Sequence, residues 1–173
     1  CVYMLVDCVS CVGVMLLKEI TTGKNNTALG HDVLVTRSTA SLMTSVGQEA
    51  LKVNTTGTQS LAFGSNVLYT NTTGSYNVGM GYAALNANTT GSDNVAVGQE
   101  ALAVNTLGNY STAVGYWALR RATTGTYNVA MGRRALDAVT TTSYNIAIGS
   151  SALETNTGQS NTAVGHQALT ANT

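Results

Sequence analysis

The sequence contains no proline and very little charge, and both absences restrict what the protein can be. Charged residues make up 9% of its 173 residues, against a usual share of about a quarter. Lysine plus arginine and aspartate plus glutamate number eight each, so the net charge is zero. A neutral chain offers no electrostatic footprint for nucleic acid or for an anionic membrane. Its surface must be built mainly from Thr, Ser, Asn and Gly.

Aromatic residues are also scarce, with one Trp, one Phe and eight Tyr. A large core of interlocking rings is therefore excluded, and small apolar side chains must do the packing. Disordered chains share the low charge and the abundant Gly, Thr and Asn, but they lack regularly spaced Val, Ile, Leu and Met. The spacing of these residues indicates an ordered, repetitive structure.

A glycine recurs every 17 residues, with one interval of 16 before the last, and this is the dominant pattern of the chain. A leucine follows each of these glycines by four residues, and the residue before that leucine is mostly Ala. The glycines predicted to form structural turns are Gly30, Gly47, Gly64, Gly81, Gly98, Gly115, Gly132, Gly149 and Gly165, preceded by Gly13. The leucines predicted to form the core are Leu34, Leu51, Leu68, Leu85, Leu102, Leu119, Leu136, Leu153 and Leu169.

The repeat unit reads G-x-x-A-L-x-x-N-T-T-G-x-x-N-x-A-V, as in residues 81–97. It contains two short β-prone runs, such as 94–97 and 101–104, separated by Gly or Asn-Thr-Thr-Gly. These are turn sequences in which glycine is expected to supply a positive φ at no steric cost. Each interior glycine costs a helix about 0.8–1.0 kcal/mol relative to Ala, so a helix is disfavoured. A unit this short cannot bury its own apolar side chains, and stability must come from stacking units on one another.

These features predict an all-β fold, a parallel β-solenoid (β-roll) of about ten 17-residue coils that is oligomeric or stacked into a fibre. Stacked coils at about 4.8 Å each would make a rod on the order of 45–50 Å long. We divide the chain into an apolar N-terminal segment, 1–12, acting as a cap or docking strand, and a repeat domain, 13–173.

The Ala-Val pair before each turn glycine predicts a self-association face, because adjacent strand residues point to opposite sides. If Ala lines the narrow interior, the bulkier partner faces outward; the opposite assignment would leave a flat small-residue face outside. Either face invites another copy of the chain, because a continuous apolar stripe on a soluble monomer is an interaction surface. The predicted outward file is Val46, Phe63, Met80, Val97, Val114, Met131, Ile148 and Val164.

Three kinds of polar or aromatic column have both structural and functional interpretations. Two asparagine columns, represented by Asn94 and Asn88, can form amide ladders or recognise a glycan or an ion, and we prefer the ladder. The paired threonines, such as Thr89 and Thr90, suggest ice binding, but adjacent threonines point to opposite sides, so turn threonines that satisfy the backbone are preferred. An exposed aromatic column predicted beside the turns could bind a receptor or carbohydrate, or pack at a chain interface; it comprises Tyr76, Tyr110, Tyr127 and Tyr144.

Catalytic and metal-binding residues are sparse. The two histidines, His31 and His166, occupy equivalent positions in distant repeats and cannot meet within one chain. No acid pair, triad or metal cluster can be assembled, so we predict no enzyme activity, no cofactor and no metal. The position that follows each histidine is variable in the repeat and holds Asp32, Glu49, Glu100, Trp117, Arg134 and Ser151.

All three cysteines lie in the first eleven residues. Cys8 and Cys11 form a C-x-x-C without a second pair or a nearby histidine. For these two cysteines and Cys1, a disulfide or free thiols are therefore favoured over metal binding. The opening 17 residues are apolar but contain Asp7 and lack a basic start, which is untypical of a signal peptide, and they are too short for a membrane span.

The strings N-T-A-V-G-H-Q-A-L at 161–169 and N-T-T-G-S-D-N-V-A-V-G at 88–98 resemble the repeats of bacteriophage tail fibres. They are more distantly similar to the head repeats of trimeric autotransporter adhesins. The resemblance implies a parallel β-roll, commonly of three chains about one axis, exposed on a virion or cell surface and binding a host glycan or receptor.

Together the residues and the resemblance lead us to expect an extracellular, non-enzymatic fibre subunit whose partner is itself, as a homotrimer or a head-to-tail filament. A filament subunit without an adhesive role and an ice- or glycan-binding solenoid are the alternatives.

Overall fold

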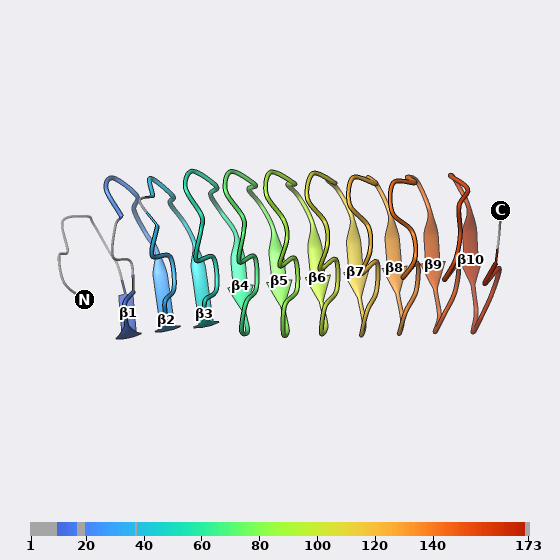
Figure 1. Ribbon diagram of the computed structural model, residues 1–173, viewed down its shortest axis with the longest axis horizontal. Helices are drawn as coiled ribbons and strands as arrows, with labels where there is room; N and C mark the ends of the chain where they lie inside the picture. Colours follow the sequence, from blue (N-terminus) through green and yellow to red (C-terminus); the bar gives the residue numbers. More distant parts are fainter. Residues whose placement is uncertain (1–9, 17–19, 37, 172–173) are drawn as a thin grey trace.

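The computed structural model describes residues 10–16, 20–36 and 38–171, and it shows one short strand in each coil. The strands lie side by side along the long axis of a rod, with β1 and β10 at opposite ends (Figure 1). Among the described residues there is no helix. The strands are β1 (Ser10–Val14), β2 (Thr27–His31), β3 (Thr44–Gln48), β4 (Leu61–Phe63), β5 (Val78–Met80), β6 (Val95–Val97), β7 (Thr112–Val114), β8 (Val129–Met131), β9 (Ile146–Ile148) and β10 (Thr162–Val164).

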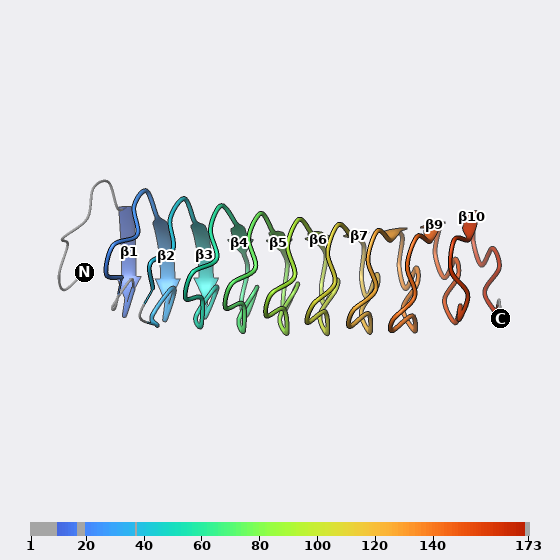
Figure 2. The same cartoon turned by 90° about the horizontal axis from the view of Figure 1, so that it is seen from above.

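All ten strands form one parallel sheet in sequence order, β1 to β10. The register follows the repeat, so that Gly13 pairs with Gly30 and Gly30 with Gly47. The loops stack in the same order beside the strands (Figure 2). The predicted fold class, a parallel β-solenoid with 17-residue spacing, is confirmed. The predicted boundary between residues 12 and 13 falls within β1, and residues 1–9, with Cys1 and Cys8, lie outside the described residues.

The second β-prone run of each unit is not a strand. Residues 101–104 form consecutive turns, because Glu100 and Leu102 adopt positive φ angles of 53° and 51° and the chain cannot extend through them. The coils are nevertheless hydrogen bonded here: the Glu100 N–H donates to the Tyr82 carbonyl at 2.8 Å, and the Leu102 N–H donates to the Ala118 carbonyl at 3.0 Å. Donors of this run thus reach both the preceding and the following coil, and the backbone is satisfied without a second sheet.

The core consists of the leucine column packed against alanines of the strands and turns. Ala101 and Leu102 are adjacent, yet both are buried, because the left-handed conformation of the leucine breaks the alternation that an extended strand would impose. The leucines from Leu34 to Leu153 are fully buried. Leu169, which we predicted in the core, is instead 52% exposed, because no further coil packs over it in the described chain.

The two glycine columns are required for different reasons. Gly98 has a φ of +129°, and an added Cβ would lie 2.5 Å from the Gly115 carbonyl oxygen of the next coil. Gly91, from the Asn-Thr-Thr-Gly turn, has no positive φ, contrary to our expectation for that turn. Its added Cβ would lie 2.4 Å from the Gly108 oxygen and 2.5 Å from Asn88 Oδ1. Close approach of neighbouring coils, rather than backbone conformation, excludes a side chain there.

Two glycine-to-alanine substitutions separate the backbone and steric requirements. Gly165 shares the positive φ of Gly98, but its added Cβ would meet only Ala168 Cβ, at 3.9 Å. We expect Gly165→Ala to lower the free energy of unfolding by about 1–3 kcal/mol through backbone strain alone. Gly98→Ala adds the clash with Gly115 and should cost about 4 kcal/mol or more. Urea denaturation of both variants measures the difference, and equal costs would contradict coil contact as the constraint.

Candidate interaction surfaces

The sheet presents an apolar surface to the outside. In β6 the middle residue Ala96 is fully buried, whereas Val95 and Val97 on either side of it are half-exposed and point outward. The same pattern recurs in β4 to β10, where the middle residue is buried in every strand. In the predicted outward file, Phe63, Met80, Met131, Ile148 and Val164 are exposed, and Val46, Val97 and Val114 are half-exposed.

A second outward file runs parallel to the first at the start of each strand. We call the two files together the sheet face. Neither file contains a charged residue, and the second one is apolar except for three threonines. A continuous apolar surface along a rod is unusual for an isolated soluble chain. The second file comprises Thr44, Leu61, Val78, Val95, Thr112, Val129, Ile146 and Thr162.

One asparagine column forms a buried side-chain ladder. The Nδ2 group of Asn71 donates to Asn54 Oδ1 at 2.7 Å, and Asn88 donates to Asn71 in the same way. The ladder ends at Asn105, because Ala122 occupies the next place and leaves Asn105 Oδ1 without a partner. The predicted amide ladder is confirmed, and these amides are buried rather than offered to a ligand.

The second asparagine column bonds to the backbone of the next coil. Asn94 Nδ2 donates to the Gly108 carbonyl at 2.8 Å, and Asn94 Oδ1 accepts from the Ser111 N–H at 3.0 Å. The amide therefore joins adjacent coils through both of its polar ends. Its burial leaves no amide group of Asn94 free for recognition.

The first threonine of each pair satisfies the backbone, as predicted. Thr72 Oγ1 donates to the Thr89 carbonyl at 3.0 Å, and Thr89 Oγ1 donates to the Thr106 carbonyl at 2.9 Å. The same bond is repeated from Thr55 to Thr123. These hydroxyl hydrogens are used between coils, so this column does not present them to ice or to a saccharide.

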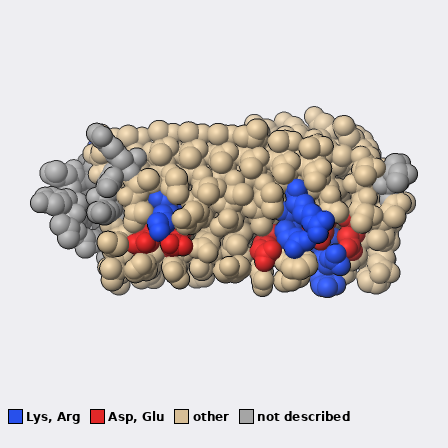
Figure 3. Space-filling model, in the orientation of Figure 1, with Lys and Arg blue, Asp and Glu red and all other residues tan. Residues whose placement is uncertain are grey.

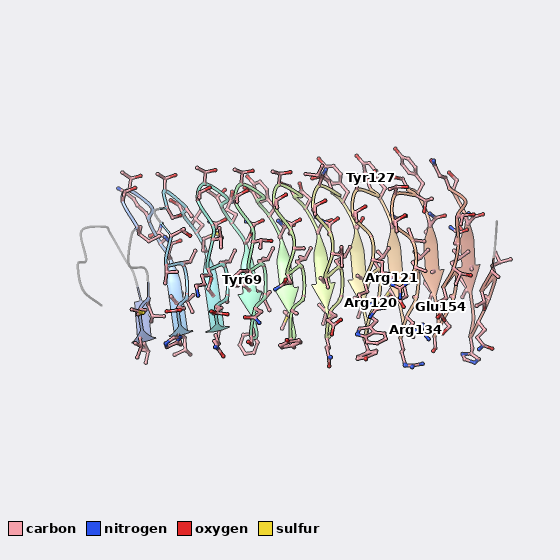
Figure 4. All side chains as sticks on the ribbon, viewed as in Figure 1. Tyr69, Arg120, Arg121, Tyr127, Arg134 and Glu154 are labelled. Carbon is pink, nitrogen blue, oxygen red and sulfur yellow. The ribbon has the colours of Figure 1, made fainter. Side chains whose placement is uncertain are left out.

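Three of the four predicted tyrosines stack on the outside of the rod. The ring centroids of Tyr110 and Tyr127 are 4.8 Å apart with an interplanar angle of 13°, and those of Tyr127 and Tyr144 are 5.2 Å apart at 4°. We call these three residues the tyrosine strip. Tyr76 lies in the same column but outside the strip, because Asp93 stands between it and Tyr110. Tyr127 extends from one edge of the rod, away from the labelled arginines (Figure 4).

Charged side chains gather in two groups on an otherwise uncharged face (Figure 3). In the first group, Lys52 Nζ lies 2.7 Å from Glu49 and 3.1 Å from Asp32. The hydrogen bonds that Lys52 donates to Glu49 and Asp32 raise the pKa of Lys52. His31 Nδ1 lies 3.7 Å from Asp32. The Lys52 cation is therefore paired with two carboxylates of its own group.

The second group, which we call the arginine ridge, joins three neighbouring coils. The Asp137 side chain is only 2% exposed and lies 3.0 Å from Arg120 Nε and 3.4 Å from Arg134 Nε. Arg134 also contacts Glu154 at 2.7 Å. The Arg120 guanidinium lies 3.8 Å from the ring centroid of Trp117, which stacks on Tyr116 at 4.5 Å. Aromatic and charged side chains are thus held together by contacts between coils.

The arginine ridge also contains Arg121 and Arg133, both exposed and without an ion-pair partner among the described residues. Four of the eight lysines and arginines of the chain therefore fall between residues 120 and 134. The carboxylates that pair with them in the ridge are Asp137 and Glu154. Sequence analysis did not identify this cluster. The separation of Arg120 and Asp137 by one full repeat was the signal that places them together.

The predicted histidines remain far apart, His31 in β2 and His166 after β10. Among the described residues, no group of three or more His, Cys, Asp or Glu side chains is placed to hold a metal ion. No helix in the described part of the chain is long and apolar enough to cross a membrane.

Comparisons of the chain with protein-family models, with curated proteins and with solved structures found no match. The structure supports the resemblance stated above at the level of architecture, a parallel β-solenoid with 17-residue coils.

Asp137 should be the residue on which the arginine ridge depends. We expect Asp137→Asn to lower the free energy of unfolding by about 1–3 kcal/mol, because it removes the buried charge that two partly exposed guanidinium groups contact. Glu154→Gln is the control: Arg134 keeps Asp137, so the cost should stay below about 1 kcal/mol. Urea denaturation compares the two, and an equal loss would show that Asp137 has no special role.

Proposed function

We propose that the protein is a non-enzymatic structural subunit of an extracellular fibre, and that copies of the chain associate through the sheet face. The observation that supports this proposal is the pair of uncharged, apolar files that run along β3 to β10 on the outside of the rod. Burial of such a surface is the main favourable term in protein association.

The geometry of the sheet face suits an identical partner. Its side chains repeat once per coil because the strands are in register. Two such faces can interdigitate along their length, as the inner faces of packed sheets do at a separation of about 10 Å. A partner with the same repeat meets the same spacing at every coil, so one favourable contact is multiplied along the rod.

The sheet face lies along the side of the rod, which favours side-by-side association over a head-to-tail filament. The resemblance to tail-fibre repeats suggests three chains about one axis and an extracellular location. The non-enzymatic character is supported by the ion pairs of Lys52, Arg120 and Arg134 with Asp32, Asp137 and Glu154, which engage these titratable side chains in contacts between coils.

The experiment is a mass measurement in solution combined with substitution of the sheet face. Sedimentation equilibrium of the full chain should give a discrete oligomer. The double variant Val97→Asp and Val114→Asp should raise the dissociation constant more than tenfold, which corresponds to about 1.4 kcal/mol or more. The reason is that two carboxylates per chain would be desolvated at the interface. Both side chains point away from the core, so the coil itself should persist in circular dichroism.

Leu107→Asp is the matched control, because Leu107 is an exposed apolar side chain in a turn outside the sheet face. It should leave the mass distribution unchanged. A wild-type chain that stays monomeric at all accessible concentrations would rule out the proposal, and open-ended polymers would favour the filament.

The arginine ridge supports a second role, adhesion to an acidic glycan. Arg121 and Arg133 carry charges that no described carboxylate compensates, and guanidinium groups bind carboxylate or sulfate in a bidentate manner. The stacked rings of Tyr116 and Trp117 lie within the same ridge and offer an apolar platform for the face of a sugar ring. These residues occupy variable positions of the repeat, so the coil itself does not require them.

The extent of the arginine ridge favours a glycan over a polynucleotide. At about 4.8 Å per coil, the three coils that contribute to it span about 15 Å. Proteins that track a phosphate backbone use many cations along its length, whereas only two guanidinium groups are uncompensated here. Isolated acid groups on a saccharide match that number.

Adhesion is tested with immobilised polygalacturonate, with neutral dextran as the negative control. We expect the full chain to bind polygalacturonate, with affinity that falls as salt is added. Arg121→Ser with Arg133→Ser should weaken binding at least tenfold, and the Lys pair at the same positions should lose less because it keeps the charge. Equal binding to dextran would contradict the role, as would stronger binding to single-stranded DNA.

A further inference from the structure

The tyrosine strip is used by neither proposed role, and its geometry points to a chemical modification. We propose that Tyr110, Tyr127 and Tyr144 form an oxidative cross-linking site, at which a peroxidase-type one-electron oxidant joins neighbouring rings as dityrosine. The stacked pairs have centroid distances of 4.8 and 5.2 Å. The inference is independent of self-association, because it concerns contacts between coils of one chain.

The backbone holds the three rings in position. Each tyrosine has a positive φ between 55° and 61°, so all three leave the chain in the same direction. The Tyr127 N–H donates to the Asn109 carbonyl and the Tyr144 N–H to the Thr126 carbonyl, both at 3.1 Å. Each bond ties a tyrosine to the coil before it. Each ring therefore has a neighbouring ring at a distance set by the coil spacing, which gives coupling a high effective concentration.

The rings are also accessible to an oxidant. Tyr110, Tyr127 and Tyr144 are 52%, 47% and 56% exposed. Among the described residues, no hydrogen-bond partner restrains their phenol hydroxyls. An exposed phenol can lose an electron to the oxidant and a proton to solvent, and a half-exposed ring can pivot about its side-chain bonds to bring an ortho carbon toward its neighbour.

The chemistry balances with hydrogen peroxide as the oxidant. Two phenols each lose one hydrogen atom, as an electron and a proton, to give two phenoxyl radicals. The radicals form one carbon–carbon bond between ortho positions, and the hydrogen on each bonded carbon moves to the phenol oxygen as the ring regains aromaticity. The peroxide takes up two electrons and two protons and leaves as two molecules of water. The product is lighter than the two tyrosines by two hydrogen atoms.

The sequence contains its own control residues. Tyr76 belongs to the same column and is equally exposed, but the equivalent residues of its neighbouring coils are Gln59 and Asp93, so it has no ring to couple with. Tyr82 is exposed on another column, between Ser65 and Gln99. If exposure alone governed coupling, these two tyrosines would react as readily as the strip.

Trypsin cleavage after Lys52 and after each of the four arginines from 120 to 134 places the three strip tyrosines in different peptides. The peptide that holds Tyr110 also contains Tyr69, Tyr76, Tyr82 and Tyr116, so its linked residue is located by fragmentation in the mass spectrometer. Tyr110 falls in 53–120, Tyr127 in 122–133 and Tyr144 in 135–173. Each predicted cross-link therefore joins two separate peptides. A mixture of isotopically light and heavy chains distinguishes a link within one chain from a link between two.

The experiment treats the full dilute chain with a haem peroxidase and hydrogen peroxide, followed by digestion and mass spectrometry. We expect peptide 122–133 to be linked to 53–120 and to 135–173, each product two hydrogens lighter than its parts and single in isotope label. Tyr127→Phe should abolish both links, Tyr144→Phe only one, and Tyr76→Phe neither. Circular dichroism verifies that each variant keeps its coil.

Three results would overturn the proposal. These are cross-links spread over Tyr76 and Tyr82 as much as over the strip, mixed-label products in the statistical proportion expected for links between chains, and no dityrosine fluorescence after complete oxidant consumption. If Tyr127→Phe lost its structure, the persistence of the Tyr110–Tyr127 link in Tyr144→Phe would still decide the question.

Discussion

The structure depends on hydrogen bonds that join each coil to its two neighbours in strict register. They continue outside the sheet, as in the turn where Glu100 donates to the preceding coil and Leu102 to the following one. Because every coil is fixed one repeat from the next, equivalent side chains meet at about 4.8 Å. Each column must therefore tolerate its own residue type as a neighbour. Stacked amides form hydrogen bonds with one another, and stacked aromatic rings pack face to face. Glycine is required where the carbonyl of the next coil leaves no room for a Cβ atom.

Charge is the residue property that register tolerates least, because like charges at this spacing repel. The chain meets this constraint by placing a cation of one column between two carboxylates of another. Arg120, Asp137 and Glu154 follow one another one repeat apart, with Arg134 between the two carboxylates. Lys52 is placed between Asp32 and Glu49 in the same way. The low charge content of the sequence is thus a consequence of stacking, and the uncompensated Arg121 and Arg133 stand out against it.

The sequence was sufficient to predict the period, the parallel stacking, the amide ladder and the backbone role of the threonines, because all four follow from identical residues in register. It did not show that the Ala101–Leu102 run is a turn. Leucine rarely adopts the left-handed conformation, and no residue type in the run indicates it. The arginine ridge was missed because its contacts cross coils. Leu169 is exposed although it was predicted in the core, because burial of a column residue requires a coil on both sides.

The division between fixed and variable columns allows one rod to carry both proposed roles, association and recognition. The sheet face repeats the same apolar chemistry from coil to coil, so its contact energy grows with length and is insensitive to any single coil. Trp117, Arg121 and Arg133 occupy positions that other coils fill with unrelated residues. A binding site there can change without disturbing the stack. In the proposed roles, association therefore belongs to the repeated columns and specificity to the variable ones, which is the arrangement expected of a fibre that presents a local recognition site.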